Sequence, residues 1–199
     1  MPTVNSELVE SELKQLVFDF SHMSNEIQAD LFNCSFAELR EGIRKGKLDV
    51  ALSLEVEMEG NRNCLCERLY QEQTCLLVPA GWGYDAGREY SIADFRKITF
   101  IVAKENEGIS RMLYQLCQEH DFEPDTIVAP DFETMMLWIE QGLGVAGSGE
   151  GHLGKDSPYI TSLSIREFHP LWFAVGWNKD NYNPLIPEFV ENLLKGMNS

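Results

Sequence analysis

The first residues with an arrangement suited to chemistry are the glycines of Gly142-Leu143-Gly144-Val145-Ala146-Gly147, which have the letters of a dinucleotide-binding loop. Such a loop follows a strand and opens a helix, so that the helix N-terminus meets the pyrophosphate. Here the pattern predicts the reverse order, with a helix that ends at Gly142 and a strand over Leu143–Ala146. We therefore interpret the first glycine as a helix C-cap.

Two cysteines and four histidines are the candidate metal ligands. Cys64-Leu65-Cys66 is not followed by a second cysteine or histidine pair at zinc spacing. The histidines are scattered along the chain: His22, His120, His152 and His169. Alternation along a strand places the two cysteines on one face, where they pack as small hydrophobic side chains. We expect no metal and no cofactor.

Catalytic constellations are equally sparse. Gly147-Ser148-Gly149-Glu150-Gly151 resembles a nucleophile elbow only superficially. Cys117 follows the apolar Leu116 inside a predicted helix, which is a core position rather than that of an activated thiol. Asp131 is better explained as a helix cap than as an acid or base. Because a site needs a base, a nucleophile and an orienting group together, we expect no enzyme activity.

Helix starts that follow strands offer the remaining chemistry. They lie at Ser35, at Glu107–Ser110 and at Asp131. In open α/β sheets ligands bind beyond the carboxyl ends of strands, where helix N-termini present N–H groups. Hydroxyls at these starts would add donors, and Lys104 would add a cation, so we favour an anionic small molecule. The alternative is that each hydroxyl only caps its own helix.

The elements that would position these groups alternate along the chain. Helical periodicity predicts an amphipathic helix over 7–22 and a helix opened by a capping box of Ser35 and Glu38. Later helices are expected from Gly108, after Asp131 and from Pro187. Strands are expected over 27–32, 48–52, 61–80, 98–103, 126–129, 143–146, 159–163 and 171–177. This order indicates an α/β fold with largely parallel sheets and two subdomains.

Composition narrows the possible partners. The chain has 199 residues and a formal charge of -16, which disfavours contact with nucleic acid or an anionic membrane. No segment approaches the ~20 apolar residues that span a bilayer, and residues 1–12 lack the features of a secretory signal. Five unpatterned cysteines suit a reducing cytoplasm.

Several segments together resemble one known family. They are Ser35–Ile43 followed by Gly46-Lys47-Leu48-Asp49-Val50-Ala51, the segment Glu67–Pro79, Ser91-Ile92-Ala93-Asp94-Phe95, and Glu133–Ala146. Their order and spacing are similar to those of the effector-binding domain of LysR-type transcriptional regulators, over about residues 7–195. The resemblance implies a type II periplasmic-binding-protein-like fold, with two Rossmann-like subdomains and a ligand cleft between them. It further implies a homodimer or tetramer that senses a small metabolite.

The resemblance also assigns domains and site residues. Subdomain I would comprise 1–78 and 168–199, and subdomain II would comprise 79–167. The family's N-terminal winged helix-turn-helix, through which promoter DNA is bound, does not fit before Glu7, and the family's first strand would lie over 2–5. The effector-binding positions map to Asn5, Ser6, Ser35, Phe36, Ser53, Lys104, Gly108, Ser110, Phe132, Thr134, Gly147 and Ser148.

Two other classes use the same fold. A solute-binding receptor of a transporter is the main alternative, although the chain has no signal peptide and an odd number of cysteines. An enzyme on this fold is the third, and it lacks a recognisable catalytic constellation.

Overall fold

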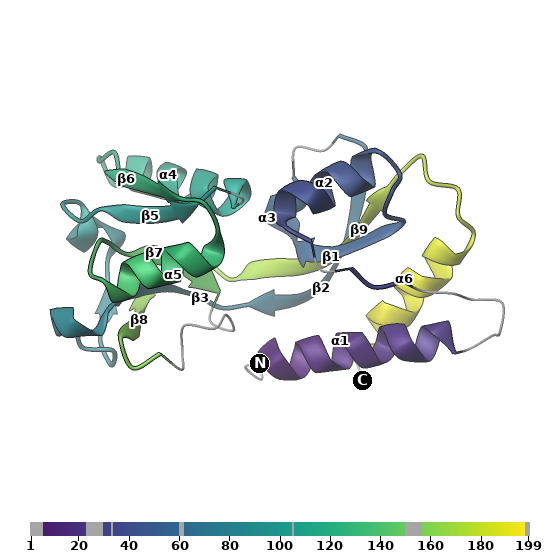
Figure 1. Ribbon diagram of the computed structural model, residues 1–199, viewed down its shortest axis with the longest axis horizontal. Helices are drawn as coiled ribbons and strands as arrows, with labels where there is room; N and C mark the ends of the chain where they lie inside the picture. The colour runs from purple at the N-terminus through teal and green to yellow at the C-terminus, as the bar shows by residue number, and fades with distance from the viewer. Residues whose placement is uncertain are drawn as a thin grey trace. The chain divides into compact units, whose positions relative to one another are not determined.

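The computed structural model describes residues 6–22, 30–32, 34–59, 62–104, 106–149 and 157–197. By its internal contacts the chain forms two compact units. Unit 1 comprises Met1–Gln71 and Trp172–Ser199, and unit 2 comprises Glu72–Leu171. Each unit is described by itself below (Figure 1).

Unit 1 is built around a three-stranded sheet in the order β1-β9-β2. The strands are β1 (Val50–Leu54), β2 (Cys64–Glu72) and β9 (Leu171–Asn178), and β1 runs antiparallel to β9. Alternation along β1 turns Ala51 toward one face and Val50 and Leu52 toward the other, so the sheet is covered on both sides.

The helices of unit 1 supply these two covers. On the Ala51 face lie α2 (Phe36–Arg44) and α3 (Glu55–Met58). On the other face lies α6 (Leu185–Gly196), against which α1 (Ser6–Ser21) packs side by side (Figure 1). An edge-to-face contact between Phe20 and Phe189, with ring centroids 5.1 Å apart, fixes this helix pair.

Unit 2 contains a four-stranded sheet in the order β4-β8-β3-β7 and the parallel pair β5-β6. Its strands are β3 (Thr74–Pro79), β4 (Glu89–Tyr90), β5 (Phe100–Ala103), β6 (Thr126–Ala129), β7 (Ala146–Gly149) and β8 (Ile160–Ile165). A parallel bridge between Phe100 and Val145 joins the two sheets edge to edge. Helix α4 (Glu107–Glu119) contributes to the core on one face, and α5 (Phe132–Glu140) to the core on the other.

Two short 3-10 helices complete unit 2, η1 (Ala80–Trp82) and η2 (Ile92–Phe95). Ser91 caps η2 as the serine of a capping box with Asp94. Phe95 and Phe100 are fully buried in the same core as Leu113 and Cys117 of α4, so the short helix closes one end of that core. The prediction that Cys117 is a core residue is confirmed.

The expectation of largely parallel sheets is wrong for the described strands. β3 runs antiparallel to both β7 and β8, and β1 antiparallel to β9. These partners are far apart in sequence, and the hydrophobic pattern of a strand reports its burial but not the direction of its neighbour. A mixed α/β fold results.

Other differences are local. The strand expected over 27–32 is absent at 30–32, and the rest of that segment lies outside the described residues. The first strand of the family, expected over 2–5, also lies outside the described residues. The strand expected at Leu143–Ala146 is displaced to Ala146–Gly149. Gly142 has φ +80 and ends α5, while a side chain at Gly144 would begin 2.3 Å from the carbonyl oxygen of Thr99. Backbone geometry therefore explains the first two glycines of the dinucleotide-like letters.

Candidate functional site

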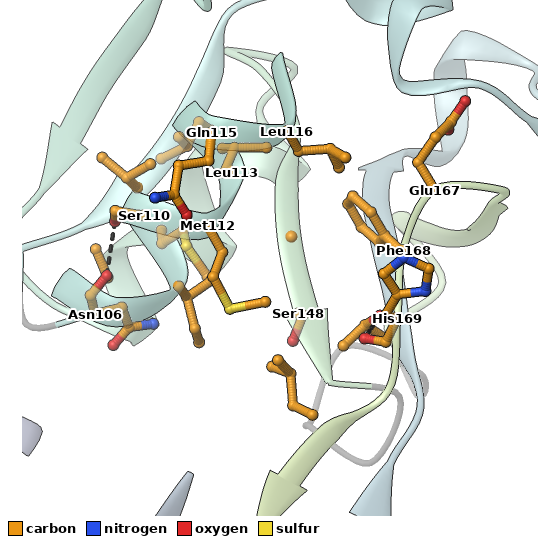
Figure 2. A pocket seen from close by; sticks show the side chains of 18 of the residues that line it. Asn106, Ser110, Met112, Leu113, Gln115, Leu116, Ser148, Glu167, Phe168 and His169 are labelled. Carbon is orange, nitrogen blue, oxygen red and sulfur yellow. Dashed lines mark hydrogen bonds between the residues drawn. The ribbon is translucent and has the colours of Figure 1, made fainter. Parts of the chain in front are cut away.

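A cavity of about 220 Å³ lies wholly within unit 2 (Figure 2). It is smaller than the roughly 300–1,000 Å³ of pockets that hold drug-sized ligands. Its walls come from β5, one face of α4, β7 and the segment 167–171 that leads into β9. We call it the unit 2 pocket. Its volume suits a small metabolite.

The amphipathic pattern of α4 determines one wall of the pocket. Ile109, Met112, Leu113 and Leu116 share a helix face. Leu113 is buried in the core, whereas Met112 keeps 38% of its surface exposed. The pattern predicts a core-facing stripe, and all four residues of that stripe also line the cavity.

The start of α4 brings polar groups to the pocket. The backbone N–H of Ser110 donates to the carbonyl oxygen of Asn106 over 3.0 Å, and the Ser110 hydroxyl donates to the same oxygen over 2.7 Å. Asn106 precedes the helix and its side chain makes no cap hydrogen bond. The Ser110 hydroxyl keeps its acceptor lone pairs for a ligand, and Figure 2 shows both residues at one side of the cavity.

The opposite wall carries Phe168 and His169. Gly147 of β7 faces the Phe168 ring, which a Cβ at this position would meet at an ordinary contact distance of 3.9 Å. The Thr74 hydroxyl donates to the carbonyl oxygen of His169 over 3.1 Å and ties this segment to β3. Ser148 of β7, 7% exposed, adds a hydroxyl to the lining.

Glu167 borders the pocket but its carboxylate is engaged elsewhere. It accepts hydrogen bonds from the Ser91 hydroxyl over 2.7 Å and from the Ile92 N–H over 2.9 Å, and Figure 2 shows it turned away from the cavity. Burial would raise the pKa of Glu167, but these bonds and the nearby His120 outweigh it and lower the pKa. Glu167 therefore positions η2 rather than a ligand.

The described lining is apolar with few charged groups. Its apolar members are Ile101, Val102, Ala103, Ile109, Met112, Leu113, Leu116, Met135, Phe168 and Leu171. Its uncharged polar members are Thr74, Asn106, Ser110, Gln115 and Ser148. Glu119, Glu167 and His169 are the ionisable ones, and none of the described lining residues is Lys or Arg.

Three of the residues predicted from the sequence meet in this pocket, namely Ser110, Gly147 and Ser148. Lys104 is exposed just after β5, and Gly108 is buried within α4. Neither of these two lines the pocket.

At the start of α5, Asp131 accepts the Thr134 N–H over 2.7 Å, and hydrogen bonds from Thr134 lower the pKa of Asp131. This helix end is therefore capped by a carboxylate, as the capping alternative predicts. Phe132 and Thr134 lie in this first turn and are outside the pocket lining.

The remaining predicted residues belong to unit 1. The Ser35 hydroxyl accepts a hydrogen bond from the Glu38 N–H over 3.3 Å, and the Glu38 carboxylate accepts one from the Ser35 N–H. These two bonds confirm the capping box beside Phe36. Ser53 is 2% exposed, and its hydroxyl has no hydrogen-bond partner among the described residues. Asn5 lies outside the described residues, and Ser6 begins α1.

Some lining residues were missed by the sequence analysis, above all Met112, Phe168 and His169. The helical periodicity of α4 was the only signal for Met112, and it indicated burial. Nothing local in the sequence indicates that residues 167–171 return beside α4. That neighbourhood is a product of tertiary structure.

Metal and membrane sites were sought in the described residues as well. There, no group of three or more His, Cys, Asp and Glu side chains is placed to hold a metal ion. No helix among them is long and apolar enough to cross a membrane.

Comparison with known proteins identifies relatives of this fold. A family model described as the LysR substrate binding domain matches residues 5–198. No curated protein matches the chain. Among solved structures, the effector-binding domain of QuiR in complex with shikimate is similar with a TM-score of 0.74 and 17% identity, over 92% of this chain and 88% of that one.

Two further structures show the same fold. The regulatory domain of Synechocystis PCC6803 CcmR in complex with 2-PG has a TM-score of 0.73 and 14% identity, over 94% of this chain and 91% of that one. Full-length CbnR complexed with its target DNA has a TM-score of 0.72 and 17% identity, over 94% of this chain and 66% of that one.

Proposed function

The chain belongs to the family of LysR substrate-binding domains, and from this premise we propose that it senses a small effector in the unit 2 pocket. The observation that carries the proposal is a cavity of about 220 Å³ whose apolar walls carry the hydroxyls of Ser110 and Ser148. A few polar groups on an apolar wall orient a small ligand. The family consists of regulatory domains rather than enzymes, and two relatives are named as complexes with shikimate and with 2-PG.

The charge of the effector can be argued from the pocket. The helix N-termini and Lys104 led us to favour an anion. The described lining, however, includes Glu119 and neither Lys nor Arg, while Asp131 caps α5 and Ser35 caps α2. An anion in this pocket would face the Glu119 carboxylate, with no Lys or Arg among the described lining residues to balance its charge. We therefore infer an uncharged ligand with an apolar body and one or two hydroxyl or carbonyl groups, and an anion stays the competing prediction.

The proposal extends to a longer protein of this family. The effector would favour whichever of two conformations it binds more tightly. That shift would alter how an attached winged helix-turn-helix binds promoter DNA. We expect a homodimer or a tetramer of such a protein in the cytoplasm.

Thermal unfolding in the presence of small metabolites tests the pocket. A panel should pair each neutral compound with its carboxylate analogue, because a bound ligand raises the midpoint by an amount set by its concentration over its Kd. We expect Met112→Trp to abolish that rise by filling the cavity, and Leu137→Trp, on the exposed side of α5, to retain it. Equal shifts in both variants would place the effector elsewhere, and a response to carboxylates alone would support the anion.

A further inference from the structure

Three sulfur atoms meet in unit 1 on the side of the sheet covered by α2 and α3. Met58 ends α3, and Cys64 and Cys66 lie at the start of β2. The Sγ atoms of the two cysteines are 3.7 Å apart, and the Cys66 Sγ lies 4.0 Å from the Met58 Sδ. Alternation along β2 places both cysteines on one face, as the sequence predicts.

The three sulfurs converge on one point above Gly176 of β9. The position that a side chain at Gly176 would occupy lies 2.5 Å from the Met58 Sδ, 3.1 Å from the Cys64 Sγ and 3.3 Å from the Cys66 Sγ. Met58 is 3% exposed, whereas both cysteines are half-buried. Solvent therefore reaches the thiols, and a residue other than glycine at 176 would displace the sulfurs.

We propose that Met58, Cys64 and Cys66 form a three-sulfur site for the monovalent copper ion Cu(I). Metal–thiolate bonds are about 2.3 Å long, so three in one plane at equal angles hold their sulfurs about 4.0 Å apart. The two sulfur–sulfur distances in the structure, 3.7 and 4.0 Å, match this spacing with little movement.

The ligand types select the metal. Thiolate and thioether sulfurs are soft and favour Cu(I). Zinc is held by four ligands in its structural sites, drawn from Cys, His, Asp and Glu, and a thioether is not among them. The sequence predicts no metal site here, because Cys64-Leu65-Cys66 is not followed by a second cysteine or histidine pair. The third sulfur comes from a methionine that only the return of α3 toward β2 brings into place.

Binding of the metal changes the charge of the site. Thiols bind metals as thiolates, so Cu(I) would release both thiol protons to solvent. Two thiolates, one neutral thioether and one Cu(I) leave the site with one net negative charge.

A disulfide between the same cysteines is the competing outcome. Residues two apart on a strand have Cα atoms separated by about 6.6 Å or slightly more. That separation is at the upper end of the roughly 4.4–6.8 Å found for disulfides. The strand would have to bend to bring the two Sγ atoms from 3.7 Å to bonding distance, whereas a shared metal ion would need little change in that separation.

Anaerobic titration tests the site. The fully reduced chain should withdraw one equivalent of Cu(I) from a bicinchoninate complex, and X-ray absorption should show three sulfur neighbours and no nitrogen. We expect Cys64→Ser and Cys66→Ser to weaken binding by at least about tenfold, because each removes a soft ligand. Met58→Leu should leave two sulfurs around the metal, and its circular dichroism should match that of the unaltered chain.

Cys34→Ser is the matched control, because Cys34 packs against the same core cluster and is similarly half-buried. It should bind Cu(I) like the unaltered chain. Equal losses in all three cysteine variants would show unspecific thiol binding and overturn the proposal. So would coordination by nitrogen or oxygen, tighter binding of Zn(II) than of Cu(I), or a Cys64–Cys66 disulfide that forms readily and cannot be prevented by Cu(I).

Discussion

The guanidinium of Arg40 lies 3.0 Å from the carboxylate of Glu57, whose side chain has no exposed surface. The two residues come from α2 and α3, and the same guanidinium reaches the Glu57 carbonyl oxygen over 3.4 Å. Burying a carboxylate away from water costs free energy, and the paired guanidinium compensates part of that cost. The pair therefore fixes α3, and with it Met58, against α2.

Removing this cation should destabilise unit 1. We expect Arg40→Met to lower the free energy of unfolding by about 3–5 kcal/mol, because it leaves a buried charge without its countercharge. Urea denaturation measures the loss. Arg44→Met is the control, since Arg44 pairs with Glu41 on the exposed side of α2 and should change stability far less than Arg40→Met. Similar losses in both would contradict the role given to Arg40.

Glu167 should make unit 2 sensitive to acid. Its pKa is lowered in the fold, so its contribution is complete above the ordinary carboxyl pKa of about 4.3 and is lost as the pH falls through the lower folded value. Glu167→Gln should therefore reduce stability at neutral pH and flatten the acid limb of the stability profile. Thermal unfolding between pH 7 and pH 3 measures both. An unchanged acid limb would show that the negative charge of Glu167 does not strengthen its hydrogen bonds with Ser91 and Ile92.

The Ser53 hydroxyl offers a test of what a buried polar group without a hydrogen-bond partner costs in stability. Its buried hydroxyl has no partner among the described residues, and an unsatisfied group of this kind costs about 1–3 kcal/mol. Ser53→Ala should thus leave stability unchanged or raise it, and it should not change binding in the unit 2 pocket, which Ser53 does not line. Ser164→Ala, exposed on β8, should alter neither quantity. A clear loss of stability on Ser53→Ala would instead assign the hydroxyl a structural partner.

The edge of unit 2 offers a test of the expected homodimer. β6 pairs with β5 alone among the described strands, and Val128 on β6 is 59% exposed. An open edge with an apolar side chain is suited to pairing between chains, which a lysine disfavours. Light scattering should give a dimer that Val128→Lys shifts toward the monomer. Tyr182→Lys, 89% exposed in unit 1, is the control, and a monomeric unaltered chain would contradict the prediction.

Local chemistry was readable from the sequence where neighbouring residues decide the structure. The capping box of Ser35 and Glu38, the cap at Asp131 and the stop at Gly142 involve groups within a few residues of each other. The helical stripe of α4 and the strand at Thr126–Ala129 follow from periodicity. The family resemblance rests on the same local segments in order.

The pairing of strands far apart in the chain could not be predicted, because the hydrophobic pattern of a strand does not indicate which strand lies beside it. β3 lies between β7 and β8, and segment 167–171 returns beside α4, which together create the unit 2 pocket. Met58, Cys64 and Cys66 meet only because β9 passes beneath them with a glycine at 176. The sequence by itself determined most of the helices and strands and the caps of the helices. Tertiary packing alone decided which side chains share a cavity, since that depends on contacts between residues far apart in the sequence.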